Sequence, residues 1–288
     1  MKVKKAVIPA AGLGTRVLPV SKAMPKEMIP IVDKPAIEYI VTEAANAGIE
    51  DILIITNRGK GIIEDHFDYT PELANRLEAG GKLDFLESVN RAAQLANIYF
   101  IRQKEAKGLG HAVSCAKAFV GNEPFAVLYG DDVIIGEDPC IAQLMRAYDE
   151  FGTGGALAIK EVTEEQIQKY SSMKLTALRD NIYEVTDMIE KPSLDKVFSM
   201  FSILGRVILP PEIFDILENT PPGAGGEIQL TDAMGVLARQ SKMVGVDFTG
   251  TRYDMGNKLG ILQATVEVAL NHPELKNDFR DYLKRLSL

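Results

Sequence analysis

A short apolar run at residues 5–8 leads directly into a stretch with two glycines, Ala10-Ala-Gly-Leu-Gly-Thr-Arg16. Strand-like and helix-like segments then alternate through the first half of the chain. The hydrophobic pattern predicts helices at 35–47, 82–96 and 110–119, and strands at 51–56, 98–101 and 125–129. Strands separated by helices pair in parallel, because each helix carries the chain back to the edge of the sheet where the previous strand began. The pattern therefore predicts an α/β protein with helices on both faces of a sheet.

The second half has a different pattern. Strand-like runs at 156–160, 174–179, 182–188 and 203–209 come with few helices between them, and helices are expected at 211–218, 229–240 and 257–270. This predicts a mixed, mostly parallel sheet with a small antiparallel insertion. A last helical segment spaces its apolar residues on one face, at Leu275, Phe279, Tyr282, Leu283 and Leu286. That face either packs on the protein's own core or forms a contact between subunits.

Composition excludes several classes of protein. The chain has 288 residues, 46% of them hydrophobic, and a formal net charge of −8. Such a chain can bury a large core, and its acidic balance argues against a nucleic-acid binder. Two cysteines cannot form a disulfide framework, which favours a cytoplasmic protein. Uninterrupted apolar stretches stay below 18 residues, so no membrane span is predicted.

The charge of the first 34 residues departs from that of the rest. They contain seven Lys or Arg and two acidic residues, a net charge of +5, which leaves −13 for the remaining residues. Glycines after a strand let the backbone approach a phosphate, and ligands bind at that edge of a parallel sheet. The dinucleotide fingerprint GxGxxG fails at Val17, and the Walker A motif fails at Leu18. The loop is therefore a candidate triphosphate site of another kind.

The loop and the residues behind it resemble the sugar-nucleotide pyrophosphorylases, among them the bacterial uridylyltransferases that use glucose-1-phosphate. The resemblance begins with Gly12-Leu-Gly-Thr-Arg16, Leu18-Pro19 and Pro25-Lys26. It continues in order along nearly the whole chain, at Gln103-Lys-Glu-Ala-Lys-Gly-Leu-Gly-His-Ala112, Gly130-Asp-Asp132, Glu190-Lys-Pro192, Gly205-Arg206, residues 225–233 and residues 253–260. The ordered set is specific, although no single block is decisive.

The resemblance implies a single Rossmann-like, three-layer nucleotidyltransferase domain over residues 1–288. Residues 1–135 would form its nucleotide-binding half, 136–255 its sugar-phosphate-binding half, and 256–288 would be C-terminal helices with a possible oligomer contact. The implied reaction is Mg²⁺-dependent transfer of UMP from UTP to glucose-1-phosphate, which gives UDP-glucose and pyrophosphate. The implied protein is cytoplasmic and a homodimer or homotetramer, with neither nucleic acid nor membrane as a partner.

The same resemblance implies the site residues, by their numbers in this chain. Arg16, Lys26, Asp131 and Lys191 would be catalytic; Ala10, Ala11, Gly12, Gly14, Thr15, Gln103 and Gly108 would bind the nucleotide; Gly130, Glu190, Lys191, Gly205 and Glu227 would bind the sugar phosphate; Asp131 and Asp254 would hold Mg²⁺. The Gln103 amide can pair with O4 and N3–H of uracil. His111, at a predicted helix start, is expected to be structural. A phosphate nucleophile is already an anion, so the absence of a Ser/His/Asp arrangement is consistent with this chemistry.

Three other functions compete with this one. A sibling transferase that uses dTTP, ATP or another sugar phosphate would share the fold and the phosphate chemistry, and the motif around Gln103 favours UTP. A nicotinamide-dependent oxidoreductase would explain a GxG loop, but Val17 and the lack of an acidic residue about 20 positions later argue against it. A non-catalytic binding protein would require a broken catalytic set, and Arg16, Lys26, Asp131 and Lys191 are all present.

Overall fold

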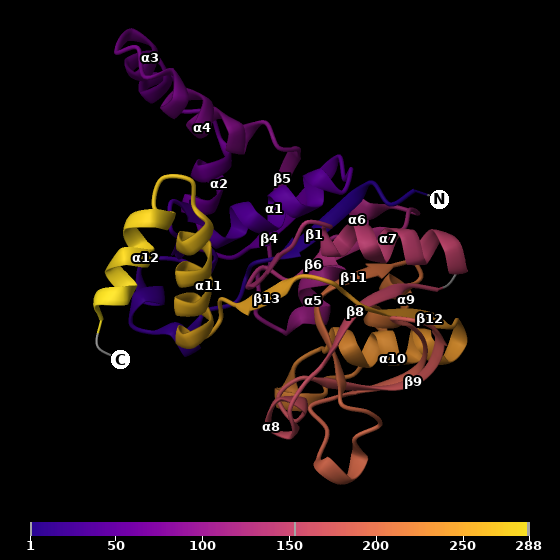
Figure 1. The fold of residues 1–288 in the computed structure, drawn as a ribbon. Helices are drawn as coiled ribbons and strands as arrows, with labels where there is room; N and C mark the ends of the chain where they lie inside the picture. Colours follow the sequence, from indigo (N-terminus) through magenta and orange to yellow (C-terminus); the bar gives the residue numbers. More distant parts are fainter. Residues whose placement is uncertain (1, 153, 287–288) are drawn as a thin grey trace.

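The computed structural model describes residues 2–152 and 154–286 and is built around one nine-stranded sheet (Figure 1). In spatial order the strands are β5 (Asn97–Arg102), β4 (Asp51–Thr56), β1 (Lys5–Pro9), β6 (Phe125–Leu128), β11 (Phe201–Leu209), β8 (Ala156–Glu161), β12 (Met243–Asp247), β10 (Ile182–Glu190) and β9 (Ser171–Arg179). The pairings make β10 and β11 run against the other strands. The predicted mixed, mostly parallel sheet is confirmed. Both halves of the chain contribute to it.

Helices cover both faces of the sheet, because the strands are apolar on both sides. In β1, Ala6 and Ile8 belong to one buried cluster, whereas Val7 between them belongs to the other. The first cluster is covered by α1 (Ala36–Asn46), α2 (Gly61–Phe67), α4 (Leu83–Ala93), α7 (Cys140–Phe151) and α11 (Lys258–Asn271). The second is covered by α5 (Leu109–Ser114), α6 (Lys117–Val120), α9 (Ile213–Glu218) and α10 (Leu230–Gln240). This is the predicted three-layer arrangement.

The antiparallel region of the second half lies within the main sheet. Its strands β9 and β10 form a hairpin at the sheet edge. Two small antiparallel sheets stand apart: β7 (Asp132–Ile135) pairs with β13 (Thr251–Asp254), and β2 (Pro30–Ile31) pairs with β3 (Lys34–Pro35). The first of them matters for function, because it joins the residues after β6 to a segment more than 100 positions later.

Some helices differ from the sequence prediction. The predicted helix at 110–119 is two short helices, α5 and α6. Four helices were not anticipated: α2, α3 (Pro71–Ala79), α7 and the short α8 (Glu164–Ile167). The helical spacing of Ile141, Leu144 and Ala147 could have revealed α7, whose apolar face is buried. In Figure 1, α3 and α4 project from the body of the protein as an arm.

The C-terminal helix does not enter the core. α12 (Lys276–Arg285) contacts α11 and has no buried residue. Leu275, Tyr282 and Leu286 are exposed, so the predicted apolar face does not pack on the protein's own core. Residues 287 and 288, the end of the predicted C-terminal segment, lie outside the described residues. Within the described ranges, no helix is long and apolar enough to cross a membrane.

Candidate active site

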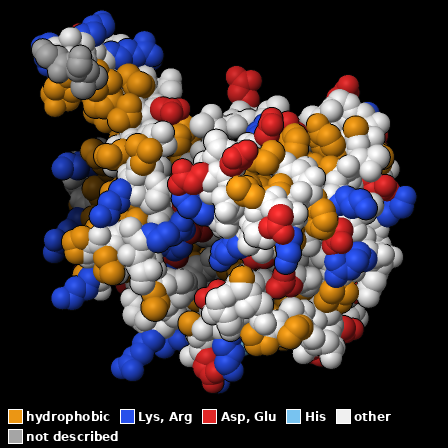
Figure 2. Space-filling model, turned by 90° about the horizontal axis from the view of Figure 1, so that it is seen from below, with side chains coloured by type: hydrophobic (Ala, Val, Ile, Leu, Met, Phe, Trp, Pro, Cys, Tyr) orange, Lys and Arg blue, Asp and Glu red, His pale blue; other side chains and the backbone are white. Residues whose placement is uncertain are grey.

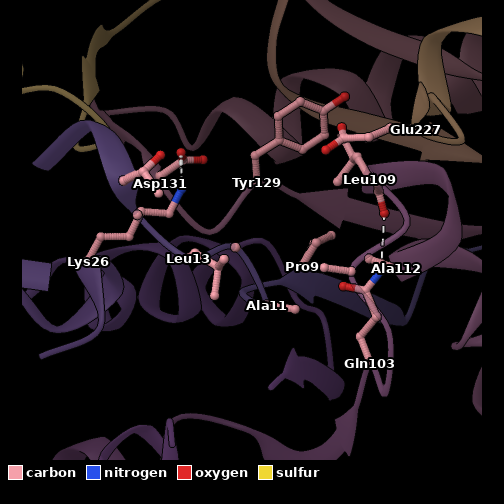
Figure 3. Close-up of a pocket in the computed structure, with 15 residues that line it drawn as sticks. Pro9, Ala11, Leu13, Lys26, Gln103, Leu109, Ala112, Tyr129, Asp131 and Glu227 are labelled. Atoms are coloured by element: carbon pink, nitrogen blue, oxygen red, sulfur yellow. Dashed lines mark hydrogen bonds and ion pairs between the residues drawn. The ribbon is translucent and has the colours of Figure 1, made fainter. Parts of the chain in front are cut away.

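A cavity of about 410 Å³ lies at the carboxyl ends of the parallel strands. Backbone hydrogen bonds continue the sheet just beyond the strand ends: Ala10 N donates to Ile55 O, Gln103 N to Thr56 O, and Gly130 N to Pro9 O. The segments after β1, β5 and β6 therefore meet at one edge. Figure 3 shows Lys26 and Asp131 at one end of this cavity and Gln103 at the other, with the loop after β1 between them.

The loop after β1 presents unpaired backbone donors to the cavity. Ala11, Gly12 and Leu13 line the cavity, and in the described part of the chain their N–H groups have no acceptor. Gly14 takes a positive φ of 68°, which favours glycine, and turns the chain toward the 3₁₀ helix that carries Arg16. Successive free N–H groups with a lysine nearby form a binding site for phosphate oxygens.

At one end of the cavity a lysine and an aspartate form an ion pair. Nζ of Lys26 lies 2.5 Å from Oδ2 of Asp131. Nη2 of Arg16 lies 3.6 Å from the same oxygen. Burial lowers the pKa of Lys26, but Asp131 and Glu27 more than offset it, so the pKa is raised. Burial raises the pKa of Asp131, but Lys26 and Arg16 outweigh it and hold the pKa below its ordinary value. Both groups are therefore charged at neutral pH.

The β7–β13 pairing brings a second carboxylate to this end. Asp254, at the end of β13, lies opposite Asp132 at the start of β7. Oδ2 of Asp254 lies 3.5 Å from Nη1 of Arg16 and 3.4 Å from the hydroxyl of Tyr170. Asp132 instead accepts hydrogen bonds from Arg252, at 2.8 Å from Nε. Burial, with help from Asp131 and Asp254, raises the pKa of Asp132 to about 6 despite Arg252.

Asp131 and Asp254 face a common point next to Gly256. A Cβ atom placed on Gly256 would lie 2.8 Å from Oδ1 of Asp254, 3.0 Å from Oδ2 of Asp131 and 2.3 Å from Nη2 of Arg16. A side chain here would displace the Arg16 guanidinium from its place beside the two carboxylates. No cluster of three or more His, Cys, Asp or Glu suited to a metal occurs among the described residues. Mg²⁺ needs only one or two protein carboxylates, since waters and phosphates complete its shell. The donor set therefore fits Mg²⁺.

At the other end, the Gln103 amide has a defined orientation. Nε2 of Gln103 lies 3.2 Å from Gly108 O and 2.9 Å from Nδ1 of His111. A carbonyl can only accept, so the atom facing Gly108 O is the amide nitrogen. His111 then accepts the second amide hydrogen at Nδ1 and carries its own proton on Nε2. Oε1 of Gln103 therefore stays free to accept a hydrogen bond from a ligand.

Close packing explains the glycine between Gln103 and α5. Gly108 has a φ of 102°, and a Cβ there would lie 2.7 Å from Cβ of Glu227 and 2.8 Å from Ile228 O. Only glycine satisfies both constraints. This contact also brings Glu227, from the segment before α10, to the wall of the cavity next to Tyr129 (Figure 3).

The structure places the predicted site residues in three groups. Nine line the cavity: Ala11, Gly12, Gly14, Thr15, Lys26, Gln103, Gly108, Asp131 and Glu227. Arg16 reaches it through its contact with Asp131, and Asp254 through its contact with Arg16. The other predicted residues, Ala10, Gly130, Glu190, Lys191 and Gly205, do not line it.

The predicted sugar-phosphate residues lie farther from the loop. Nζ of Lys191 lies 3.9 Å from Oε1 of Glu190, and the Lys191 side chain is half exposed. Lys191 N donates to Tyr170 O at 2.7 Å, and the Tyr170 hydroxyl reaches Asp254. Burial raises the pKa of Glu190. Gly205 packs against Asp132, where a Cβ would lie 2.6 Å from the Asp132 side chain.

Sequence reasoning missed several residues that shape the site. Arg206 is fully buried, pairs with Glu43 on α1 at 2.7 Å, and donates to the carbonyls of Gly205 and Asp132. Lys60, Tyr129 and Arg252 also support or line the site. Lys60 and Tyr129 follow the ends of the parallel strands β4 and β6, a position that could have identified them.

Comparison with known proteins gives consistent matches. Residues 5–270 match the family model described as nucleotidyl transferase. A Staphylococcus epidermidis protein named UTP–glucose-1-phosphate uridylyltransferase is 51% identical over 287 residues, covering 100% of this chain and 99% of the relative. A UTP-bound UGPase from Acinetobacter baumannii is 37% identical, with a TM-score of 0.91 and 99% coverage of both chains. A UDP-glucose pyrophosphorylase complexed with UDP-glucose is 39% identical, with a TM-score of 0.84, covering 94% of this chain and 100% of that one.

Proposed function

The chain belongs to the nucleotidyl transferase family, and we propose that it transfers UMP from UTP to glucose-1-phosphate, giving UDP-glucose and pyrophosphate. The single observation that carries the proposal is the layout of the cavity. Lys26 lies at one end, an oriented amide that can accept a hydrogen bond from a base lies at the other, and the free N–H groups of the loop lie between them. The substrates named for relatives of about 50% identity over their full length support the same reaction.

The Gln103 amide is the group proposed to recognise the base. Its free Oε1 can accept from N3–H of uracil. Cytosine has no hydrogen at N3, so CTP would place one acceptor against another, a mismatch that costs more than a lost contact. Thymine has the same N3–H as uracil. This contact therefore selects imide bases, and any preference for UTP over dTTP must come from elsewhere in the site.

The phosphate chemistry needs positioning and charge neutralisation rather than a general base. An oxygen of the glucose-1-phosphate anion attacks the α-phosphorus of UTP in line and forms a new P–O bond. The bond from the α-phosphorus to the bridging oxygen breaks, and pyrophosphate leaves with the electron pair. The loop N–H groups bind the triphosphate, while Lys26 and Arg16 stabilise the charge that accumulates on the reacting phosphates. In the structure both cations contact Asp131, which keeps them next to the cavity.

On the sugar side, Glu227 and Glu190 are proposed to accept hydrogen bonds from glucose hydroxyls, with the backbones of Gly130 and Gly205 nearby. Lys191 is proposed to bind the phosphate of glucose-1-phosphate. Its half-exposed ammonium lies only loosely against Glu190, so it can turn toward a bound anion. Lys191 also follows the strand end of β10, next to Tyr170, whose hydroxyl contacts Asp254.

Asp131 and Asp254 are the residues proposed to hold Mg²⁺. Their oxygens face one point, which is the observation that supports the assignment. When bound, the ion would neutralise phosphate charge as a Lewis acid. The two aspartates otherwise keep Arg16 and Lys26 in place.

Pyrophosphate release tests the proposal. The assay combines glucose-1-phosphate and Mg²⁺ with UTP, dTTP, ATP, CTP or GTP in turn. Strong release with UTP that is lost on adding EDTA is the expected result. Release with dTTP alone would indicate the sibling thymidylyl transfer instead. If no nucleotide supports release with any sugar-1-phosphate, the transferase proposal fails.

We also propose a homodimer or homotetramer in the cytoplasm. The exposed Leu275, Tyr282 and Leu286 on and around α12 support the assembly, because exposed apolar residues gathered on one helix favour a subunit contact. Free Cys115 and Cys140 suit a reducing compartment. Light scattering coupled to gel filtration would show a mass two or four times the 31.5 kDa of one chain, and a mass of one chain would refute the assembly. On the face shown in Figure 2, basic and acidic side chains are interspersed over the right-hand part, whereas basic side chains predominate toward the left. The proposal that nucleic acid is not a partner rests on the net charge of −8.

A further inference from the structure

Three consecutive carbonyl groups of the loop after β1 are held by side chains from one neighbouring segment. Nζ of Lys60 donates to Ala10 O at 2.5 Å and to Gly12 O at 2.8 Å. Between them, Nδ2 of Asn57 donates to Ala11 O at 2.5 Å. Both donors lie just after β4, the strand that pairs with β1. The side of the loop that faces Lys60 and Asn57 is therefore hydrogen-bonded at three successive peptide groups.

The orientation of these carbonyls also determines that of the N–H groups. In a trans peptide the C=O and the following N–H point in opposite directions. Holding the carbonyls of Ala10, Ala11 and Gly12 toward Lys60 and Asn57 therefore turns the N–H groups of Ala11, Gly12 and Leu13 the other way. These are the same three residues that line the cavity with unpaired N–H groups.

The hydrogen bonds of the Lys60 ammonium are all used to hold the loop after β1 and the segment that carries Lys26. It is 5% exposed, and its third hydrogen bond goes to Oε2 of Glu27 at 2.8 Å, so all three of its donors are used. Glu27 is 1% exposed and directly follows Lys26 in the same 3₁₀ helix. The ammonium thus joins the loop to the segment that carries Lys26.

We propose that Lys60, with Asn57 and Glu27, is a positioning device that orients the N–H groups of the loop toward the UTP phosphates. This inference rests on the proposed function. Lys60 lies outside the cavity and is separated from the phosphates by the loop itself. The loop N–H groups bind the triphosphate before and during the reaction, so loosening them weakens UTP binding more than it slows the chemical step.

The test compares Lys60→Met with Lys160→Met. Lys160 is the control, because its Nζ also pairs with a carboxylate, that of Asp247 at 2.5 Å, but among the described residues it makes no hydrogen bond to the loop after β1. UTP affinity is measured by calorimetry without sugar phosphate, and KM for each substrate by pyrophosphate release. For Lys60→Met we expect the Kd and KM for UTP to rise about tenfold or more, because buried charge-assisted hydrogen bonds are lost. The KM for glucose-1-phosphate stays within about twofold, and Lys160→Met behaves as wild type.

Asn57→Ala keeps the test decisive if Lys60→Met does not fold. It removes one neutral hydrogen bond to the same loop and should raise the KM for UTP about threefold, with little change in Tm. Unchanged UTP affinity in a folded Lys60→Met or Asn57→Ala protein would overturn the inference, as would equal loss of affinity for both substrates. A wild-type protein that neither binds nor turns over UTP would instead refute the proposed function.

Discussion

Nε2 of Gln103 donates to Nδ1 of His111 across 2.9 Å, and this contact leaves Oε1 of Gln103 as the only free hydrogen-bonding atom of the amide. The histidine expected to be structural thus sets the direction of the side chain proposed to read the base. Two residues eight positions apart, one after β5 and one in α5, act as a unit because the chain turns back at Gly108.

The first prediction concerns this contact. His111→Leu removes the acceptor and frees the Gln103 amide to rotate, so the ratio of kcat/KM for UTP over CTP should fall about tenfold. His111→Asn is the matched control, because its Oδ1 can stand near the position of Nδ1 and accept the same hydrogen bond. Competition assays with both nucleotides measure the ratio. An unchanged ratio in His111→Leu would place base recognition on other groups.

The second prediction concerns Lys26. Lys26→Met removes the cation at the reacting phosphates, and kcat should fall about a hundredfold or more, because the contact strengthens as charge develops. Lys22→Met, at an exposed position four residues earlier, should leave kcat nearly unchanged. Steady-state kinetics at saturating UTP distinguishes the two roles: a rise in KM alone would make Lys26 a residue for ground-state binding only.

The third prediction concerns the metal. Asp131→Asn keeps the shape of the side chain but loses the negative charge that attracts Mg²⁺, so Mg²⁺-dependent turnover should be mostly lost while the circular dichroism spectrum is retained. Direct Mg²⁺ titration, followed by calorimetry in the presence of UTP, should show weaker binding. Near-normal activity in Asp131→Asn would refute the metal role, whatever the result for Asp254→Asn.

The fourth prediction concerns pH. The pKa of Asp132 is raised from 3.8 to about 6, chiefly by burial. Between roughly pH 4 and pH 6 the folded protein therefore holds a proton that the unfolded chain has lost, and this group's contribution to the free energy of unfolding falls as pH rises. The free energy of unfolding, measured with urea at several pH values in this range, should fall less with rising pH for Asp132→Asn than for wild type. If it falls equally steeply with pH in both proteins, the raised pKa assigned to Asp132 is wrong.

The fifth prediction concerns the buried pair Arg206–Glu43. Arg206→Leu leaves Glu43 buried without its cation and removes donors to Asp132 O and Gly205 O, so the free energy of unfolding should fall by about 3–5 kcal/mol. The exposed pair Arg179–Glu150 is the control, and Arg179→Leu should cost under about 1 kcal/mol. Restoring stability with the double variant Arg206→Leu/Glu43→Leu would show that the unpaired charge, rather than the lost volume, causes the loss.

The fold class and most of the sheet could be predicted, because the local spacing of apolar residues indicates strands and helices. β4 was predicted at its observed bounds, and the loop after β1 was identified as an anion site from its glycines and its position after a strand. The glycine loop could be singled out from its position after a strand, whereas Lys26 and Asp131 could be singled out through the motifs that resemble the sugar-nucleotide pyrophosphorylases.

Contacts between distant segments could not be predicted in the same way. The pairing of β7 with β13 places Asp254 near Asp131, and neither strand is long enough to be conspicuous in the sequence. Lys60 and Glu43 appear in the sequence as ordinary charged residues, because nothing local distinguishes a buried ammonium or carboxylate from a solvated one. Their burial depends on what the rest of the chain packs around them.

The sequence by itself determined the layers, the edge of the sheet where the site lies and the residue types available for phosphate chemistry, since these follow from short-range periodicity and turn geometry. Only the tertiary structure decided which way the peptide groups of the loop point, which atom of Gln103 remains free and which carboxylates share Arg16. Those outcomes depend on hydrogen bonds between segments up to 238 positions apart, whose geometry exists only once the sheet has brought them together.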